Sequence, residues 1–375
     1  MSLPILTILP GCANDLLNPV ASVLLRWPQH LNHPLAWHGN DFTTEDQYIC
    51  LFSSYDKSQI QSALDHFKSL ELDGSDITEQ NFPLPNLGER LHALSEGLHH
   101  GKGFFMLRGL DPTEFSVEDN SLLYLCLSSY IAPTCGKQDE EGNMFLHIRE
   151  AKEMAAPQTE RSARDSNARL AFHTDQFPDI LALYCHGRAE TGGNHNIASS
   201  YAIYNELSIT RPDVLETLAS PDWYFDSLFV HPERRPLLFN YQGHIILNFG
   251  RIHLMATEPT DDGTFAPKPT AKQLEALDLV QQLAEKHHLS LNMDPGDLTF
   301  INNLGILHAR EEFTDSPEHT RHLVRMWLKN EDKAWPLPRT LKRGNDRTYD
   351  MATEEIWNIL PAPRVAFKIR EKYGP

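Results

Sequence analysis

The stretch HTDQFPDILALYCHGRAETGGN, residues 173–194, combines a possible metal-binding pair with an apolar run that has the length of a buried strand. Further short apolar runs follow as far as residue 330 and are separated by turn residues. One of them contains the turn sequence YQGH (241–244) and predicts a hairpin. Helical patterns lie at 58–72, 87–100, 118–129, 270–287 and in the tail 347–375. We therefore expect a mainly β fold with flanking helices (α+β), built as a sandwich or jelly roll.

His173 and Asp175 form an H-x-D pair at the end of a strand-like run. On a strand, residues i and i+2 lie on one face about 6.6 Å apart along the axis, so an imidazole and a carboxylate can converge on one ion. A chain this rich in histidine contains roughly one H-x-D by chance. His231-Pro-Glu233 offers a competing H-x-E pair, and either pair taken alone is more readily structural. A third ligand would complete the two-histidine, one-carboxylate set of non-heme Fe(II) sites, and His308 is the best candidate.

Arg321 and Arg325 stand four residues apart in the strand pattern TRHLVRMWL, which places both on one face with Leu323 and Trp327. Two guanidinium groups directed inward among apolar side chains cost free energy unless they meet an anion. A dicarboxylate cosubstrate or an acidic substrate would supply that anion. Salt bridges to Asp or Glu, which are plentiful in this acidic chain, are the alternative.

The whole set resembles the taurine dioxygenase (TauD/TfdA) family: an H-x-D pair, a gap of about 130 residues to a histidine, and Arg-x-x-x-Arg on a final strand. The resemblance covers roughly residues 87–330. It includes the stretches GKGFFMLRGL, HTDQFPDILALYCHGRAETGGN, NNLGILHAREEF and RHLVRMWL. The HAR-x-x-F portion is similar to the clavaminate synthase and γ-butyrobetaine hydroxylase branches. The resemblance implies a double-stranded β-helix (jelly-roll) core and an enzyme that depends on Fe(II), 2-oxoglutarate and O2.

The resemblance also assigns roles to single residues. It implies that His173, Asp175 and His308 bind iron and form the catalytic centre. Arg321 would pair with the distal carboxylate of 2-oxoglutarate. Arg325 would contact the other carboxylate of the cosubstrate or an acidic group of the substrate.

Three further segments of the sequence correspond to regions of the family pattern. His195 stands where the family has a threonine that helps to bind 2-oxoglutarate, and an imidazole can donate the same hydrogen bond. Gln138 and His147 fall in the region that leads to the substrate pocket, and each is expected to contact the substrate. The family's Asp-Asn-Arg before the distal histidine is Asn302-Asn303-Leu304 in this chain, a change that we do not expect to affect the metal.

The implied reaction converts 2-oxoglutarate to succinate and CO2 while an unactivated C–H bond of a small, carboxylate-bearing molecule is oxidised. The outcome would be hydroxylation, desaturation or oxidative cyclisation. Halogenation is excluded, because related halogenases replace the carboxylate ligand with a small residue and Asp175 is present. The alternative is a cupin-like metal or small-acid binding protein without oxygenase turnover. A hydrolase is disfavoured, because the sequence contains no G-x-S-x-G or H-E-x-x-H motif.

The composition indicates which binding partners and which cellular compartment to expect. The 375 residues carry 33 Lys and Arg against 51 Asp and Glu, a net charge of -18, which disfavours nucleic acid and anionic membranes and leaves a small-molecule substrate as the expected partner. Five cysteines without a C-x-x-C pair, and no basic residue before Arg26, indicate reduced thiols and a cytoplasmic location. We expect an N-terminal extension (1–86) packed on the core, the dioxygenase domain (87–345) and a peripheral C-terminal segment (346–375).

Overall fold

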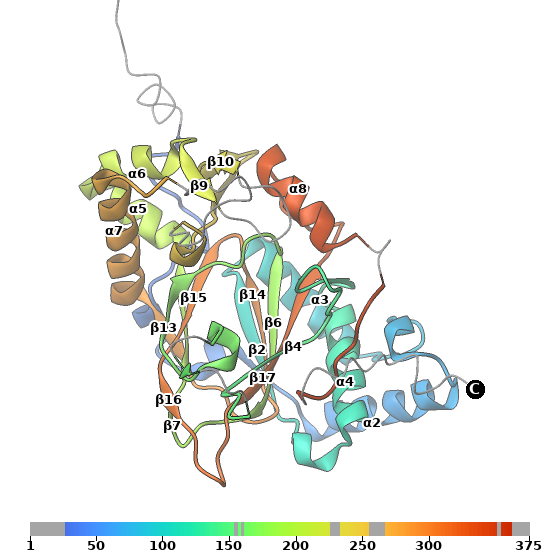
Figure 1. Cartoon of the computed structure of the whole chain (residues 1–375). Helices are drawn as coiled ribbons and strands as arrows, with labels where there is room; N and C mark the ends of the chain where they lie inside the picture. Colours follow the sequence, from blue (N-terminus) through green and yellow to red (C-terminus); the bar gives the residue numbers. More distant parts are fainter. Residues whose placement is uncertain are drawn as a thin grey trace, which may run out of the picture.

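Figure 1 shows the computed structural model, which describes residues 27–153, 157–158, 161–225, 233–254, 267–350 and 354–361. Its strands form a larger and a smaller sheet. The larger sheet has the spatial order β1 (Ile49–Leu51), β2 (Phe104–Arg108), β14 (Leu298–Asn302), β6 (Ile180–Gly187), β17 (His322–Lys329) and β3 (Thr134–Gly136), and β4 (Leu146–Arg149) also pairs with β17. The smaller sheet has the order β13 (Leu289–Leu291), β8 (His195–Ser199), β15 (Ile306–Arg310) and β5 (Leu170–His173).

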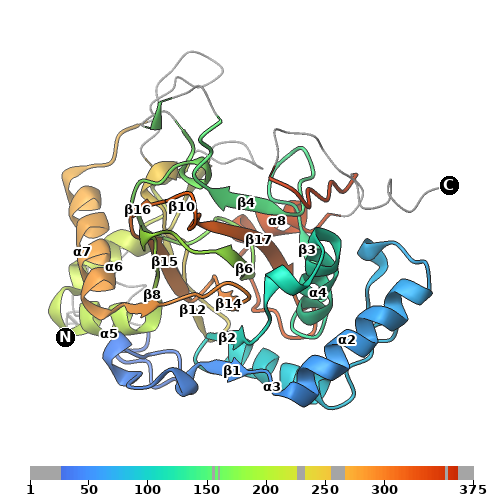
Figure 2. The same cartoon turned by 90° about the horizontal axis from the view of Figure 1, so that it is seen from below.

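Three two-stranded pairs and the helices surround these sheets. The pairs are β9 (Trp223–Phe225) with β10 (Glu233–Arg235), β11 (Leu238–Tyr241) with β12 (His244–Leu247), and β7 (Thr191–Gly192) with β16 (Phe313–Thr314). Figure 2 shows α2 (Ser54–Ser69), α3 (Leu87–His100) and α4 (Val117–Ser129) on the side of the larger sheet, and α5 (Ser200–Thr210), α6 (Pro212–Ala219) and α7 (Ala271–His287) on the side of the smaller sheet. A last helix, α8 (Arg339–Thr348), follows β17. The expected combination of sheets with flanking helices is therefore confirmed.

Strand alternation gives the larger sheet two distinct faces. Leu183 of β6 belongs to the apolar cluster shared with the smaller sheet, whereas its neighbour Tyr184 belongs to the cluster shared with α2, α3 and α4. On β17, Leu323 and Trp327 lie in the first of these clusters. Arg325 lies between them in the strand, so it also faces the smaller sheet, as the sequence pattern predicted.

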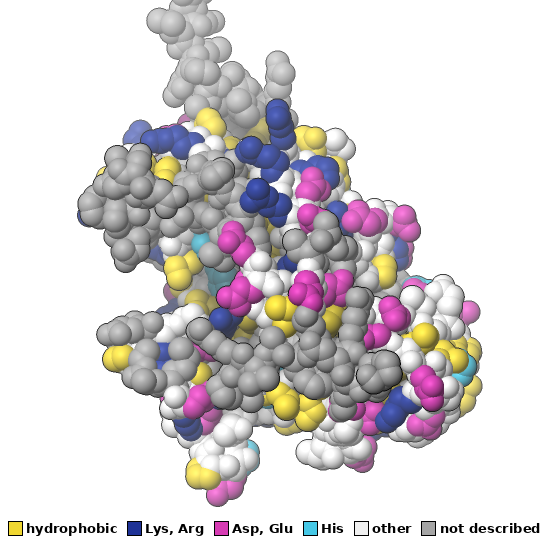
Figure 3. All heavy atoms as spheres, turned by 45° about the vertical axis from the view of Figure 1, so that its right-hand side comes forward, with side chains coloured by type: hydrophobic (Ala, Val, Ile, Leu, Met, Phe, Trp, Pro, Cys, Tyr) yellow, Lys and Arg dark blue, Asp and Glu magenta, His cyan; other side chains and the backbone are white. Residues whose placement is uncertain are grey.

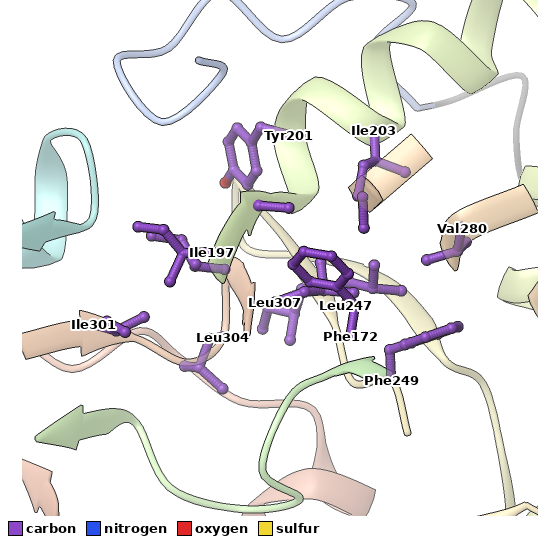
Figure 4. Close-up of a cluster of buried hydrophobic side chains, with 14 of the residues drawn as sticks. Phe172, Ile197, Tyr201, Ile203, Leu247, Phe249, Val280, Ile301, Leu304 and Leu307 are labelled. Carbon is purple, nitrogen blue, oxygen red and sulfur yellow. The ribbon is translucent and has the colours of Figure 1, made fainter. Parts of the chain in front are cut away.

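Figure 4 shows part of the apolar cluster between the smaller sheet and its helices. Phe172 of β5, Leu307 of β15 and Leu247 of β12 lie together, with Ile203 of α5 and Val280 of α7 close by. All five side chains are buried. Because adjacent residues of a strand point to opposite faces, this packing leaves the other face of β5 and β15 free to carry polar groups.

Several local expectations agree with the structure. The helix at α3 has the predicted bounds. The β11–β12 hairpin turns at Gln242 and Gly243, whose φ angles of 47° and 89° are those that a tight hairpin turn requires. The helix α2 begins at Ser54 rather than at residue 58, because the Ser53 hydroxyl accepts the Asp56 N–H and caps an additional turn.

Other parts of the chain differ from expectation. The helices α5 and α6 were not predicted; Ser199 caps α5 by accepting two backbone N–H groups, and Pro212 occupies the first turn of α6. The helix α8 was not predicted, and it crosses the expected domain boundary at residue 345. The tail beyond residue 361 and His231 of the competing H-x-E pair lie outside the described residues.

The segment before residue 87 contributes to the core. Leu35, Trp37 and Tyr48 are buried in the cluster between the sheets, and β1 pairs in parallel with β2.

None of the described helices is long and apolar enough to cross a membrane. The four described cysteines are unpaired, and acidic side chains gather across the middle of the face in Figure 3, in keeping with the net charge.

We expect truncation of Leu307 to Ala to lower the free energy of unfolding by about 2–5 kcal/mol, because Leu307 is fully buried and its removal leaves a cavity. The matched control is Ile209→Ala on α5, where the side chain is 75% exposed and the change should stay within about 0.5 kcal/mol. Urea unfolding followed by circular dichroism measures both. Equal effects of the two substitutions would contradict this assignment of the core.

Candidate metal centre and anion site

Three predicted ligands meet at one end of the smaller sheet. The β5–β15 register sets His308 opposite His173, and their ring centroids are 4.1 Å apart. Asp175 follows β5 by two residues, and its Oδ1 lies 3.9 Å from His173 Nε2 and 3.8 Å from His308 Nε2. Two ligands of one ion, each about 2.1 Å from it, are ~3–4 Å apart. Among the described residues, no other group of His, Cys, Asp or Glu side chains has three ligand atoms this close together.

The protonation of these groups suits a divalent cation. His173 Nδ1 lies 2.9 Å from the Ala171 carbonyl, which can only accept, so Nδ1 carries the proton and Nε2 keeps its lone pair. Burial lowers the pKa of both His173 and His308, which keeps the imidazoles neutral. Burial acts to raise the pKa of Asp175, but the Arg325 charge and the neighbouring histidines more than offset it and lower the pKa to about 2. Two imidazole nitrogens and one carboxylate oxygen fit non-heme Fe(II).

The second carboxylate oxygen of Asp175 is held by β17. Trp327 Nε1 donates to Oδ2 at 2.7 Å, and Arg325 Nη1 lies 3.1 Å from the same oxygen. Arg325 Nε also donates to Gln138 Oε1 at 2.8 Å. For Arg325, the structure therefore contains the salt bridge that the sequence left open as an alternative, and Gln138 reaches the site through it.

A different environment surrounds Arg321, which is buried beside a second arginine, Arg310. Arg321 Nε donates to the Gly193 carbonyl at 3.0 Å, while Arg310 donates to the carbonyls of Ala163 and Ala168. The buried Arg321 Nη1 and Arg310 Nε have no hydrogen-bond partner, and neither side chain forms a salt bridge with a described residue. Both guanidinium groups stack against the Phe313 ring, and the central carbon of each lies 5.3 Å from the ring centroid.

These two guanidiniums are candidates for binding an anion. Burial lowers the pKa of Arg310 to about 10, and burial together with the Arg310 charge does the same for Arg321, yet both remain cationic at pH 7. Two like charges buried together without a salt bridge are unfavourable unless an anion joins them. The two side chains thus offer two free N–H donors to a carboxylate from outside the chain.

His195 lies between the anion site and the metal ligands. It stands opposite Arg310 in the β8–β15 register, and its ring stacks on His308 with centroids 5.8 Å apart. Its Nε2 is buried without a partner. Burial, followed by the charge of Arg321, lowers the pKa of His195 to about 3, so the ring is neutral at pH 7.

Comparison with known proteins shows the family to which the chain belongs. The profile of the family described as "Taurine catabolism dioxygenase TauD, TfdA family" matches residues 67–327. The chain belongs to the TauD/TfdA family. It is therefore a non-heme Fe(II)- and 2-oxoglutarate-dependent dioxygenase, as its motifs implied.

Two relatives of this TauD/TfdA dioxygenase are similar over most of its length. The taurine hydroxylase-like protein SAT17 of Stachybotrys chartarum is 36% identical over 353 residues, which is 89% of this chain and 90% of the relative. The FR-33289 synthase of Streptomyces rubellomurinus is 25% identical over 316 residues, 79% of this chain and 89% of the relative.

Solved structures share the fold at lower identity. Asparagine oxygenase, in a complex described as containing Fe(II), 3-hydroxyasparagine and succinate, aligns with a TM-score of 0.59 and 17% identity over 75% of this chain and 93% of that one. The non-heme iron oxygenase OrfP, described in complex with Fe and α-ketoglutaric acid, aligns with a TM-score of 0.55 and 15% identity, again over 75% and 93%.

One prediction for this TauD/TfdA dioxygenase is wrong. His147 of β4 pairs with Val324 of β17, so it lies on the face of the larger sheet that points away from Arg325. Its Nδ1 lies 2.8 Å from His322 Nε2, and its Nε2 lies 2.6 Å from the Asn358 carbonyl. Both ring nitrogens are thus used within the protein, and the structure does not bring His147 to the metal centre.

The sequence reading also missed contributors to the site. Arg310 was not singled out, although it stands two residues after His308 on the same strand face, a signal that alternation could have supplied. Trp327 was placed on the correct face, but its hydrogen bond to Asp175 was not foreseen. No sequence pattern indicates that bond, because it links positions 152 residues apart.

We expect Trp327→Phe to weaken metal binding by roughly 10- to 100-fold, because the carboxylate of Asp175 loses the donor that orients it. The matched control is Trp335→Phe, which removes a buried indole hydrogen bond to the His99 carbonyl instead. Competition of the metal-free protein with a chelator for Zn(II) measures the dissociation constants. The role of Trp327 is refuted when the two variants bind zinc equally well.

Proposed function

We propose that His173, Asp175 and His308 hold Fe(II), that Arg321, Arg310 and His195 bind the distal carboxylate of 2-oxoglutarate, and that the enzyme oxidises an unactivated C–H bond of a small, carboxylate-bearing molecule with release of succinate and CO2. The observation that carries this proposal is the pair of buried guanidiniums beside the triad of ligand atoms, each with an unpaired N–H donor and neither in a salt bridge with a described residue. A metal-binding triad alone would suit many proteins, whereas an adjoining anion site suits a dicarboxylate cosubstrate.

When bound, Fe(II) and 2-oxoglutarate supply the O2-dependent oxidising chemistry of the family. The chain itself orients the cosubstrate and keeps the site dry. The Arg321 and Arg310 donors without partners would neutralise the distal carboxylate, and His195 Nε2 would donate to it in place of the family threonine. All three side chains are buried, so water competes weakly for these hydrogen bonds.

We assign the substrate side to Arg325 and Gln138. The Arg325 guanidinium lies 4.8 Å from the Trp327 ring and bridges Gln138 and Asp175, and it is the group best suited to bind a carboxylate there. The structures of asparagine oxygenase and OrfP are described with hydroxylated amino acids, which supports a carboxylate-bearing substrate and favours hydroxylation among the three outcomes.

We further propose that the two facing sheets form the jelly-roll core of the family, with residues 87–345 as the dioxygenase domain and the segment before residue 87 packed on it. The four unpaired cysteines support a reducing compartment such as the cytoplasm.

We expect Arg321→Met to raise the 2-oxoglutarate concentration needed for half-saturation by about 10- to 100-fold, since a hydrogen bond to a charged group is lost while the metal ligands stay intact. Arg310→Met should act in the same direction. The control is Arg188→Met, whose partner Asp294 lies at the surface. Anaerobic titration of the Fe(II)-loaded protein with 2-oxoglutarate, followed by visible absorption, measures the affinity. Unchanged affinity in both Arg321→Met and Arg310→Met would refute the anion site.

Turnover separates the oxygenase from the cupin-like alternative. Incubation with Fe(II), 2-oxoglutarate and O2 should release succinate even without substrate, slowly, and His173→Ala should abolish the release because one imidazole ligand is lost. Metal and 2-oxoglutarate binding without any succinate, in the presence of a panel of amino acids and other small carboxylic acids, would favour the binding protein.

A further inference from the structure

The loop that carries Asp175 is held by the side chains of two buried asparagines, Asn303 and Asn345. Residues 174–179 leave β5 and lie outside both main sheets, yet most of the loop is buried. Its backbone N–H and C=O groups therefore need partners other than a strand ladder. Two side chains, Asn303 and Asn345, supply several of them.

Asn303 holds the loop at the metal ligand itself. It is 1% exposed and lies in the turn between β14 and β15. Its Oδ1 accepts the Asp175 N–H at 2.8 Å, and its Nδ2 donates to the carbonyls of Asp175 at 2.9 Å and Pro178 at 2.8 Å. One amide thus binds both backbone groups of Asp175 and connects them to the strand that carries His308.

Asn345 of α8 holds the far end of the same loop. It is 1% exposed, and its Nδ2 donates to the Phe177 carbonyl at 2.8 Å and to the Asp179 carboxylate. The neighbouring Gly344 allows this approach, since a Cβ atom there would lie 2.3 Å from the Phe177 ring. The Tyr349 hydroxyl, just after α8, accepts the Asp179 N–H at 3.2 Å and donates to the Leu328 carbonyl of β17.

We propose that Asn303 and Asn345 are positioning residues that set Asp175 for metal binding, so that α8, beyond the stretch matched by the family profile, is part of the metal centre. Neither side chain touches the three ligand atoms; both act through the backbone of the loop. Trp327 then orients a carboxylate whose main chain is already in place. The proposal rests on the assignment of Asp175 as a metal ligand.

The test compares three buried asparagines, each changed to Asp, in the full chain. Asn303→Asp and Asn345→Asp replace a donor that faces loop carbonyls with an oxygen that repels them. Asn120→Asp is the matched control, because Asn120 Nδ2 also donates to backbone carbonyls, those of Pro112, Phe115 and Ser116, but at the start of α4. Zn(II) dissociation constants are measured by chelator competition, together with thermal unfolding of each metal-free protein.

We expect the first two variants to bind Zn(II) about 10- to 100-fold more weakly than the wild type, and Asn120→Asp to bind within twofold of it, although all three unfold at lower temperature. Equal zinc affinity in all four proteins would reduce Asn303 and Asn345 to structural residues and overturn the proposal. Gly344→Ala, which displaces α8 from Phe177 without changing a polar group, gives the same readout should an Asp variant fail to fold.

A further variant separates this inference from the proposed function. Asp175→Ala should lose zinc binding whatever the asparagines do, because a ligand is removed. Wild-type affinity in Asp175→Ala would refute the metal centre itself. Loss of affinity in Asp175→Ala, with wild-type affinity in both loop variants, would refute only the positioning role.

Discussion

The pairing of β15 between β5 and β8 is the constraint on which the site depends. It sets His308 opposite His173 and Arg310 opposite His195, so the proposed metal ligands and the proposed anion-binding groups form two adjacent rows on one face. The other face of the same strands is apolar and packs against α5 and α7. Hydrophobic burial on one side therefore maintains the register on the other, and a slip of one residue in β15 would turn His308 away from the site.

Charge balance divides this site into two parts. Beside His173 and His308, Arg325 and Asp175 neutralise each other, and Trp327 also donates a hydrogen bond to the Asp175 carboxylate. On the other side, neither Arg310 nor Arg321 forms a salt bridge with a described residue, although the Asp315 carboxylate accepts the backbone N–H of Arg321. Buried groups of one sign without compensation are characteristic of functional sites, where the ligand completes the balance. The chain thus neutralises Asp175 internally and leaves Arg310 and Arg321 without an internal counter-ion, which is the arrangement that the proposed 2-oxoglutarate site needs.

Sequence reasoning succeeded where a local period or a short motif carries the information. The bounds of α3 follow from helical spacing, and the inward direction of Arg325 follows from strand alternation along β17. Arg321, which directly precedes that strand, is buried as expected. It failed for His147, because the face on which a residue of β4 lies depends on the register with β17, which pairs positions at least 173 residues apart. The helix α5 was missed because its residues are buried on several sides, which conceals the helical period. The helix α6 buries one face, but it is only 8 residues long, too short for its period to stand out in the sequence.

The sequence by itself determined which atoms are available: an imidazole and a carboxylate two residues apart on a strand, a distant histidine, and two arginines on one face. Those features depend on residue type and local spacing, which the chain carries directly. Only the tertiary structure decided that Arg310 joins Arg321, that Arg325 pairs with Asp175, and that asparagines 303 and 345 hold the loop of Asp175. The physical reason is that these contacts connect residues far apart in the chain, through hydrogen bonds and ring packing whose geometry exists only once the sheets and α8 have packed together.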